Sequence, residues 1–477
     1  RAVPILERLA KTTSGKERAR VLLLAARTQG RLGDVEGAIA SYASLASEYK
    51  AYPAATEAWR KIGLLRLDQG RYTEAEEAFQ RALDTPAAGA LAEELEWKLA
   101  WTQVRQGKFQ AADEHFRAWI EKGSAAPHVH YWHARLALAR GDRDSAVTAL
   151  RVAAAPASPS CYAVFARILL RKLGVTPPEP EKGPERFLEP VSPRKNAETG
   201  VRRSEALYGL GFFEWARADS WALHGRPSRL SAPERLGWGV WYQQVGDFAR
   251  ATRFAGAGFR SRAGGYPRYH DGDPRWRLAY PRAFRDKLEG IDWPDTVPED
   301  LVYAIMRQES RFDTWAVSPA GARGPMQLMP ETAREVARRL GMPAPSTRLL
   351  HDPRTAVTLG AWLLAGHLER YGGNLPLAIA AYNAGEAAVD RWLEERPGLP
   401  IDVFLEEISY AETRNYVRKV LANLWVYSRL YGRGLADFAD EIPLEPASPL
   451  PVVSGSGGGG GQGGTSGGGG PWGTFVP

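Results

Sequence analysis

The 477-residue sequence predicts an all-helical protein built from several domains. Three observations support this fold class. The first part of the chain repeats a helical-hairpin pattern, the last third carries clear helix start and stop signals, and no alternating strand pattern extends beyond a few residues. A chain of this length exceeds what one hydrophobic core usually supports, so we expect two or three folded domains.

Residues 1–175 are predicted to form a solenoid of helical hairpins. Glycines recur at intervals of 37, 37 and 34 residues, at Gly33, Gly70, Gly107 and Gly141. An alanine follows each glycine by five residues and a large apolar residue follows it by nine, which suits two helices that approach closely around a filled groove. The pattern resembles the tetratricopeptide repeat, whose units stack side by side. Such repeats are scaffolds in many proteins and do not indicate a function by themselves.

Composition suggests the remaining boundaries. Residues 176–200 are rich in proline and charge and are predicted to be a linker or a long loop. Helical patterning resumes over 201–285. Several tryptophans cluster there, and they suit either the packing of helices or stacking on sugar rings. Residues 286–440 are predicted to form a compact, mostly helical domain. The Gly-rich residues 441–477 cannot bury a core, so we expect them to be disordered.

Two helix starts in the 286–440 domain have specific signals. Thr296-Val297-Pro298-Glu299 has the spacing of a capping box before an apolar run. Asp352-Pro353 combines an N-cap residue with proline at the first helical position. We therefore predict helices that open at Val297 and at Pro353.

The composition argues against several kinds of site. Cys161 is the only cysteine, so neither an internal disulfide nor a cysteine-based zinc site can form. The eight histidines form no HExxH motif, and we expect no catalytic metal and no other cofactor. No long uninterrupted apolar run is present, so no membrane span is expected. The sequence begins with Arg1 rather than Met, and any signal peptide is expected to be missing from it.

The positive charge lies mainly outside the 286–440 domain. The chain has a net charge of +7, but residues 286–440 carry 17 basic and 22 acidic side chains, and the rest carry 45 and 33. This excess of +12 is explained either by a solvated surface or by attraction to a polyanion. The aromatic and basic motifs of nucleic-acid-binding proteins are not found, so we expect no nucleic-acid partner.

Glu309 is a candidate acid. It lies four residues after Ile305 and eight after Leu301, on the apolar stripe of the helix predicted from Val297. Desolvation raises the pKa of a carboxyl, and the negative end of the helix dipole acts in the same direction. Cleavage of a glycosidic bond requires a carboxylic acid that keeps its proton near neutral pH. A helix-terminal glutamate is also often solvated or salt-bridged, so this position alone leaves both interpretations open.

Four short motifs follow one another in the last third of the chain. They are Glu309-Ser310, Gly324-Pro325-Met326-Gln327, Ala381-Tyr382-Asn383-Ala384-Gly385 and Glu412-Thr413-Arg414-Asn415-Tyr416. In this order and spacing they resemble the soluble lytic transglycosylases, which have a goose-lysozyme-like catalytic domain. The match covers about Ala279–Leu430, and the N-terminal solenoid resembles the superhelical ring of that family.

The resemblance implies a role for individual residues. Glu309 matches the catalytic glutamate, and Tyr382 matches a tyrosine whose hydroxyl lies near the catalytic carboxyl. The resemblance also implies that eight residues contact the substrate: Ser318, Met326, Gln327, Met329, Tyr382, Asn383, Glu412 and Tyr416. Each of these also has an ordinary structural explanation, such as core filling by methionine or a backbone hydrogen bond by an amide. Pro325 departs from the leucine that is usual in the family, and its missing N–H puts the affinity of one subsite in doubt.

The resemblance also implies the reaction. The expected substrates are peptidoglycan glycan strands and muropeptides in the periplasm, cleaved between N-acetylmuramic acid and N-acetylglucosamine with a 1,6-anhydromuramyl product. Glu309 would be the single general acid and base, and other cell-wall proteins are candidate partners of the repeats. Two alternatives stay open: a hydrolytic muramidase on the same fold, and a non-enzymatic repeat scaffold with an inactive lysozyme-like domain.

Overall fold

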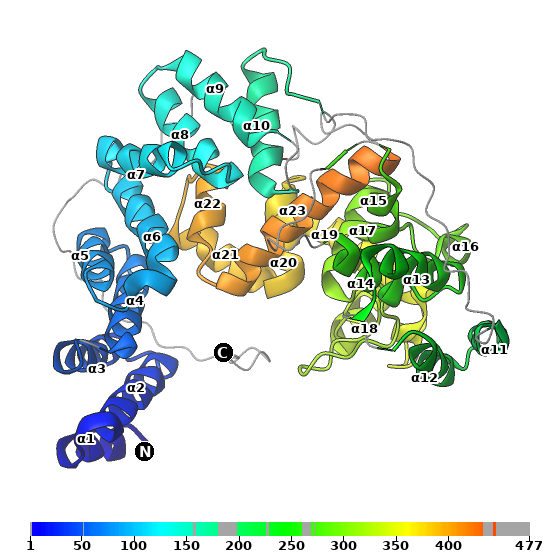
Figure 1. The fold of residues 1–477 in the computed structure, drawn as a ribbon, viewed down its shortest axis with the longest axis horizontal. Helices are drawn as coiled ribbons and strands as arrows, with labels where there is room; N and C mark the ends of the chain where they lie inside the picture. The colour runs from blue at the N-terminus through cyan, green and yellow to red at the C-terminus, as the bar shows by residue number, and fades with distance from the viewer. Residues whose placement is uncertain are drawn as a thin grey trace. The chain divides into compact units, whose positions relative to one another are not determined.

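The computed structural model describes most of the chain, and all the regular elements in its described part are helices, which confirms the predicted all-α class (Figure 1). The described residues are 2–50, 52–155, 159–179, 198–225, 229–259, 269–270, 272–432 and 442–444. Within these ranges the chain divides into two compact units, residues 2–149 and residues 150–444. Most of the predicted linker at 176–200 and of the predicted tail at 441–477 lies outside the described residues.

The first unit is a succession of helical hairpins. Its helices are α1 (Ala2–Thr12), α2 (Gly15–Arg31), α3 (Val35–Glu48), α4 (Pro53–Asp68), α5 (Tyr72–Leu83), η1 (Ala88–Leu91), α6 (Ala92–Arg105), α7 (Phe109–Glu121), α8 (Pro127–Ala139) and the first part of α9 (Arg143–Ala153). Each of the four periodic glycines lies in a turn with φ between +70° and +80°. Such angles strain a residue with a Cβ, which is why glycine recurs at these turns.

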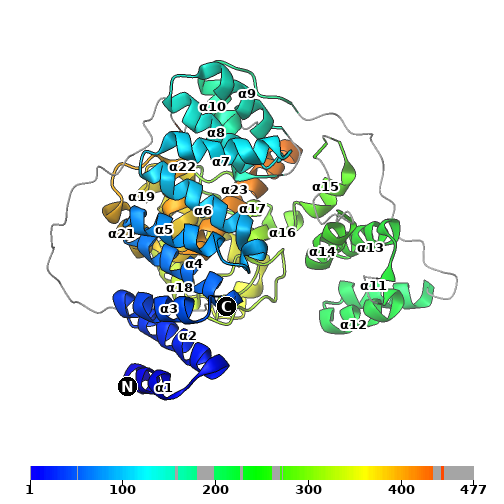
Figure 2. The ribbon, with the colours of Figure 1, turned by 60° about the vertical axis from the view of Figure 1, so that its left-hand side comes forward.

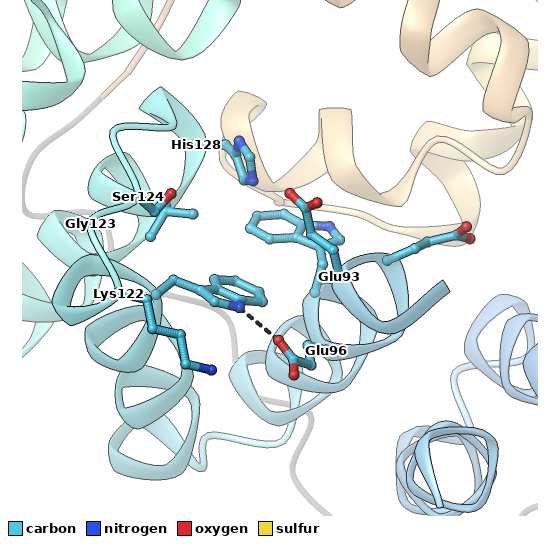
Figure 3. A pocket seen from close by; sticks show the side chains of 10 residues that line it. Glu93, Glu96, Lys122, Gly123, Ser124 and His128 are labelled. Carbon is cyan, nitrogen blue, oxygen red and sulfur yellow. Dashed lines mark hydrogen bonds between the residues drawn. The ribbon is translucent and has the colours of Figure 1, made fainter. Parts of the chain in front are cut away.

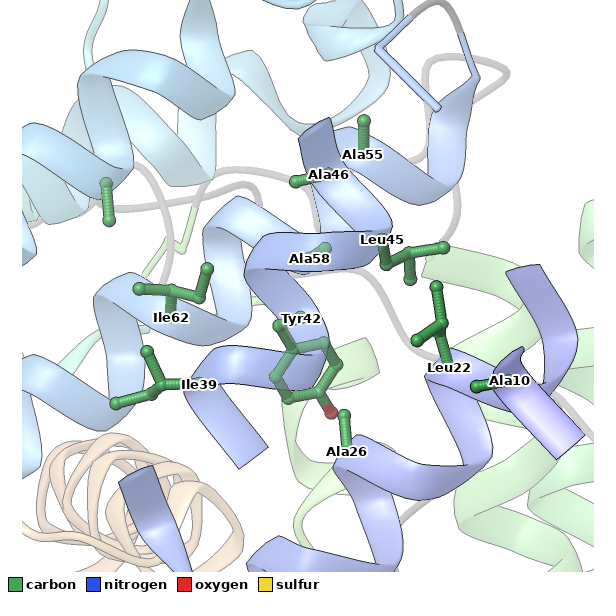
Figure 4. Packing of buried hydrophobic residues seen from close by; sticks show 11 residues of the cluster. Ala10, Leu22, Ala26, Ile39, Tyr42, Leu45, Ala46, Ala55, Ala58 and Ile62 are labelled. Atoms are coloured by element: carbon green, nitrogen blue, oxygen red, sulfur yellow. The ribbon is translucent and has the colours of Figure 1, made fainter. Parts of the chain in front are cut away.

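The small and large residues of the repeat pack as their spacing predicts. Ala75 and Phe79 are fully buried, and a Cβ on Gly63 of the neighbouring helix would lie 2.5 Å from the Phe79 ring. In the first hairpins Tyr42 is buried in a cluster of alanine, leucine and isoleucine side chains, and its hydroxyl points toward Ala26 (Figure 4). The Phe79 ring therefore fits against the neighbouring helix because Gly63 has no side chain there.

The second unit holds the remaining helices. These are α10 (Cys161–Lys172), α11 (Glu198–Gly209), α12 (Phe213–His224), α13 (Ala232–Gln244), α14 (Phe248–Phe259), α15 (Pro274–Ala279), α16 (Arg285–Leu288), α17 (Glu299–Glu309), α18 (Pro330–Arg339), η3 (Leu349–His351), α19 (Pro353–Arg370), α20 (Leu375–Ala384), α21 (Glu386–Glu395), α22 (Ile401–Glu407) and α23 (Ala411–Tyr431). Helix α17 packs along α23, and α20 packs against both α19 and α23 (Figures 1 and 2). This packing gathers the ends of α17 and α20 and the start of α23.

Helix α10 belongs to the second unit by its contacts. The Tyr162 hydroxyl of α10 donates to the buried carboxylate of Glu406, which also accepts from Arg418 of α23. Contacts therefore divide the chain between Ala149 and Leu150, ahead of residue 175, where composition places the end of the solenoid. The boundaries drawn from composition stay predictions.

The two predicted helix starts have different outcomes. Asp352 is the N-cap of α19 and accepts from the backbone N–H of Thr355 at 2.9 Å, as predicted. The predicted capping box before α17 is wrong, because this helix begins at Glu299 after Pro298, without a side-chain cap. Val297 lies instead in the preceding turn, where its carbonyl accepts from the Trp293 indole at 2.7 Å. Among the described helices, none combines the length and the apolar character that crossing a lipid bilayer requires.

Candidate active site

Glu309 is the last residue of α17. The preceding turns of this helix are buried, with Ile305 and Met306 fully inaccessible. The helix stops because Ser310 leaves helical geometry and the next two residues, Arg311 and Phe312, adopt left-handed φ angles of 53° and 67°. The chain turns sharply there, so the Glu309 carboxyl lies at the end of a rigid, buried helix.

The carboxyl of Glu309 contacts Tyr416 of α23. The Tyr416 phenol donates to Oε1 of Glu309 at 2.5 Å, and Tyr416 itself is buried. The pKa of Glu309 is raised to about 7, chiefly by burial; the hydrogen bond from Tyr416 opposes this rise, and the negative charge of Glu412 adds to it. Glu309 keeps some solvent exposure, so protein atoms crowd the carboxyl without sealing it off.

Tyr382 lies near the same carboxyl but has a different hydrogen-bond partner. Its hydroxyl donates to the backbone carbonyl of Met326 at 2.9 Å. Burial raises the pKa of Tyr382 well above its ordinary value, and the charge of Glu309 raises it further. The pKa of Tyr416 is raised by burial and then by Glu309 and Tyr382. The two tyrosines and the glutamate therefore form one cluster, in which Tyr416 makes the direct contact.

Asn383 joins the end of α20 to the start of α23. Its side-chain oxygen accepts from the hydroxyl of the buried Thr413 at 2.7 Å. Glu412, the neighbour of Thr413, is exposed in the first turn of α23. Helix α20 ends beside Asn383 because Gly385 has a φ of 82°, which a residue with a Cβ rarely adopts.

The loop between α17 and α18 is held by its own hydrogen bonds. Ser318 Oγ accepts from the backbone N–H of Ala322 at 3.0 Å. The Gln327 amide donates to the carbonyls of Ala316 and Gly324 at 3.2 and 2.9 Å. Ser318 and Gln327 are both half-buried, so these contacts support the structural role that the sequence had left open for them.

Gly324 and Pro325 fix this loop against the rest of the domain. A Cβ on Gly324 would lie 1.7 Å from the carbonyl oxygen of Leu350, so only glycine fits there. The carbonyl of Pro325 accepts from the Ser310 hydroxyl at 2.8 Å, which ties the loop to the residue after Glu309. This contact uses the backbone carbonyl, which proline has like any other residue.

The two methionines of the second motif differ. Met326 is fully buried, and a Cβ on Gly360 would lie 2.7 Å from its terminal methyl carbon. The Met326 side chain thus packs in the core against α19, which agrees with the structural explanation that the sequence left open, and its contact with substrate stays a prediction. Met329 is half-buried at the start of α18.

Trp315 is an exposed aromatic residue outside the four sequence motifs. This residue lies in the loop six positions after Glu309, and its ring is 49% exposed and stacks on His351 with centroids 5.0 Å apart. His351 is itself fixed by the carbonyl of Thr314 at 2.7 Å. Within the described ranges, no three histidine, cysteine or carboxylate side chains gather as a metal site.

Comparisons with known proteins agree with the sequence motifs. Residues 290–405 match the Transglycosylase SLT domain family, and residues 23–91 and 98–160 match a tetratricopeptide repeat family. The chain is 36% identical over 152 residues to the soluble lytic murein transglycosylase of Escherichia coli (strain K12), across 31% of this chain and 23% of that protein. It is 34% identical over 172 residues to the Salmonella typhimurium protein of the same name, across 35% of this chain and 26% of that protein. The aligned part is thus about a quarter of the length of these relatives.

Two solved structures share the fold. The lytic transglycosylase Slt of Pseudomonas aeruginosa, solved as an inactive glutamate-to-glutamine mutant, has a TM-score of 0.64 at 23% identity and covers 89% of this chain and 66% of that one. The 70-kDa soluble lytic transglycosylase in complex with bulgecin A has a TM-score of 0.69 at 21% identity and covers 91% of this chain and 66% of that one. The chain therefore carries an SLT domain and tetratricopeptide repeats, and it resembles the soluble lytic transglycosylases in the sequence of this domain and in fold, as the four motifs predicted.

Proposed function

We propose that this protein is a lytic transglycosylase that cleaves peptidoglycan, with Glu309 as its single general acid and base. One observation carries the proposal: burial raises the pKa of Glu309 to about 7, at the end of a buried helix inside the SLT domain. Such a carboxyl is protonated in a large fraction of molecules at neutral pH and can also act as a base after it has given up its proton. The relatives that match this domain are named soluble lytic murein transglycosylases.

The reaction begins with proton donation. Protonated Glu309 gives its proton to the oxygen that joins N-acetylmuramic acid to N-acetylglucosamine, and the bond from this oxygen to C1 of the muramyl sugar breaks. The acetamido group of the muramyl sugar stabilises the positive charge that develops at C1. Tyr416 occupies Oε1 of Glu309 with a hydrogen bond, which leaves Oε2 for the substrate.

The second step closes a ring. The Glu309 carboxylate takes the proton from the C6 hydroxyl of the muramyl sugar, and O6 forms a bond to C1. The product is a 1,6-anhydromuramyl sugar, Glu309 is protonated again, and no water is consumed. Among the described residues, Glu412 is the carboxylate whose charge acts on Glu309, and its exposed position favours a role in tuning the acid rather than in attack on C1. Proton transfer by a positioned side chain contributes roughly 10²–10⁴-fold to the rate.

Digestion of purified peptidoglycan sacculi tests the reaction. We expect the wild-type protein to release muropeptides with anhydro ends, and Glu309→Gln to lose nearly all of this release while it keeps its helical circular dichroism. Glu331→Gln is a matched control, because Glu331 is an exposed glutamate on α18. This variant should digest sacculi at the wild-type rate.

Mass spectrometry of the products separates the alternatives. Anhydro ends support the proposal. Reducing ends, which are heavier by one water molecule, would show a hydrolytic muramidase. If the wild-type protein releases no soluble products under conditions that support a known muramidase, the chain is a scaffold and the proposal fails.

The location and partners follow from the same proposal. A peptidoglycan substrate places the protein in the periplasm. The repeats of residues 23–160 present helical surfaces on which other cell-wall proteins can dock. Fractionation of cells that express the natural full-length protein checks the location directly.

A further inference from the structure

A cavity in the repeat unit is separate from the candidate active site. It has a volume of about 730 Å³ and lies between the start of α6, the end of α7 and the start of α8 (Figure 3). Ligand sites commonly have volumes of about 300–1,000 Å³. The side chains that define its chemistry are Glu93, Glu96, Trp97, Trp119, Lys122 and His128.

Two tryptophans form the aromatic wall of this cavity. The rings of Trp97 and Trp119 stack with centroids 6.5 Å apart and planes 18° from parallel. The Trp119 indole N–H donates to Oε2 of Glu96 at 2.7 Å, and His128 packs edge-on against Trp97 at 5.0 Å. The two half-buried indoles are therefore held in place by neighbouring residues, and both line the cavity.

Carboxylates surround the indoles. Glu93 is exposed at the cavity rim, and Glu96 holds Trp119, whereas the third glutamate of this turn, Glu94, pairs with Arg60 of α4 at 2.7 Å. Lys122 is the lysine among the residues that line the cavity (Figure 3). Residues 1–149 carry 22 basic and 19 acidic side chains, so the negative lining is a local feature of a unit that is positive overall.

Helix stabilisation does not explain the whole arrangement. Glu93 and Glu94 lie in the first turn of α6, where the helix dipole favours negative charge. The dipole gives no reason for two indoles beside them to line an open cavity, since tryptophan usually buries its large apolar surface in a core. An aromatic wall next to carboxylates is an arrangement that suits a positively charged ligand.

We infer that this cavity binds a peptide through the ammonium group of a lysine-type side chain. An ammonium within about 6 Å of an indole face is attracted by the ring quadrupole, and the attraction strengthens when water is excluded. Glu93 and Glu96 supply the opposite charge. An anionic ligand would be repelled by these carboxylates, and a neutral sugar would gain ring stacking but would leave the negative charge uncompensated. The inference stands independently of the proposed reaction, because no residue of the Glu309 cluster takes part.

Isothermal titration calorimetry on the full chain tests the inference. The probes are two short capped peptides that differ at one atom group: one has a central lysine, and the other has the same lysine acetylated on Nζ. We expect millimolar binding of the lysine peptide, at least about tenfold weaker binding of the acetylated peptide, and weaker binding as salt rises. Glu93→Gln and Trp97→Ala should each reduce the affinity at least about fivefold. Glu114→Gln should leave it unchanged, because Glu114 is exposed on α7 and does not line the cavity.

Three outcomes would overturn the inference. These are equal binding of both peptides, binding that neither Glu93→Gln nor Trp97→Ala alters, and Trp97-dependent binding of neutral chitotetraose without binding of the lysine peptide. Circular dichroism of each variant checks the fold. If Trp97→Ala unfolds the repeats, Glu93→Gln decides the question alone, since it replaces an exposed side chain with an isosteric one. Sacculus digestion reports on Glu309 and not on this cavity, so either proposal can fail without the other.

Discussion

The Tyr416 phenol donates a 2.5 Å hydrogen bond to Glu309, a residue 107 positions earlier in the sequence. The contact joins the end of α17 to the early turns of α23, which pack along each other. A phenol that donates to a carboxylate favours the charged form of the acid and holds one oxygen in a fixed place. Tyr416 thus moderates the effect of burial on Glu309 and orients it.

Tyr416→Phe should raise the pKa of Glu309 above its value of about 7. The lost hydrogen bond stabilises the carboxylate, and a hydrogen bond to a charged group is worth about 1.5–3 kcal/mol, so we expect the pKa to rise by about one or more. The alkaline limb of the pH profile of kcat/KM should move upward by the same amount. Tyr382→Phe is the matched control, because Tyr382 donates to the Met326 carbonyl and not to Glu309. Coinciding profiles for wild type and Tyr416→Phe would contradict this role.

Glu309→Gln should make the protein more stable above neutral pH. The folded-state pKa of Glu309 is raised from 4.5 to about 7, so the folded protein binds more protons than the unfolded chain between these values, and its stability falls as the pH rises through this window. Above pH 7 the free energy of unfolding is lower by at most about 3 kcal/mol than at acidic pH because of this group. Glutamine stays neutral, so the Tm of the variant should exceed that of the wild type at pH 8.5 and match it near pH 4. A Tm difference that does not change between these pH values would contradict the raised pKa.

Gly324→Ala should disrupt the loop that follows Glu309. The new Cβ would lie 1.7 Å from the Leu350 carbonyl oxygen, and the backbone has a φ of 73°. We expect the variant to lose roughly 3 kcal/mol or more of stability. We also expect it to lose activity, because the displaced Pro325 carbonyl could no longer accept the hydrogen bond from the Ser310 hydroxyl. Gly321→Ala is the matched control, since Gly321 has a φ of 94° but open space around its missing Cβ. It should cost about 1–2 kcal/mol, which is the backbone strain without the clash. Equal thermal shifts for the two variants would show that the clash is relieved cheaply.

Thr413→Val should loosen the junction between α20 and α23. Valine has nearly the shape of threonine but cannot donate to Asn383, whose side-chain oxygen accepts from the buried Thr413 hydroxyl at 2.7 Å. We expect a loss of about 1 kcal/mol in stability and a fall in kcat, because Tyr382 and Tyr416 lie on the two joined helices. The comparison of kcat with KM is the measurement. A variant that lowers Tm while kcat stays at the wild-type value would limit this hydrogen bond to a structural role.

Periodic local patterns determined much of the fold from the sequence alone. The four glycine turns of the repeats, the small and large residues that pack behind them, and the Asp352 cap of α19 are each fixed by neighbours within a few turns of helix. The position of Glu309 on an apolar stripe likewise predicted a desolvated acid, because burial along one helix follows its 3.6-residue period.

Tertiary packing decided the rest. Tyr416 lies against Glu309, and Met326 turns into the core, only because α17, α19, α20 and α23 assemble around them. The capping box before α17 failed because Trp293 holds Val297 in a turn, a contact that no cap motif encodes. Sequence periodicity specifies which face of a helix is buried, whereas the partner of a buried polar group is set by contacts between segments that lie far apart in the chain.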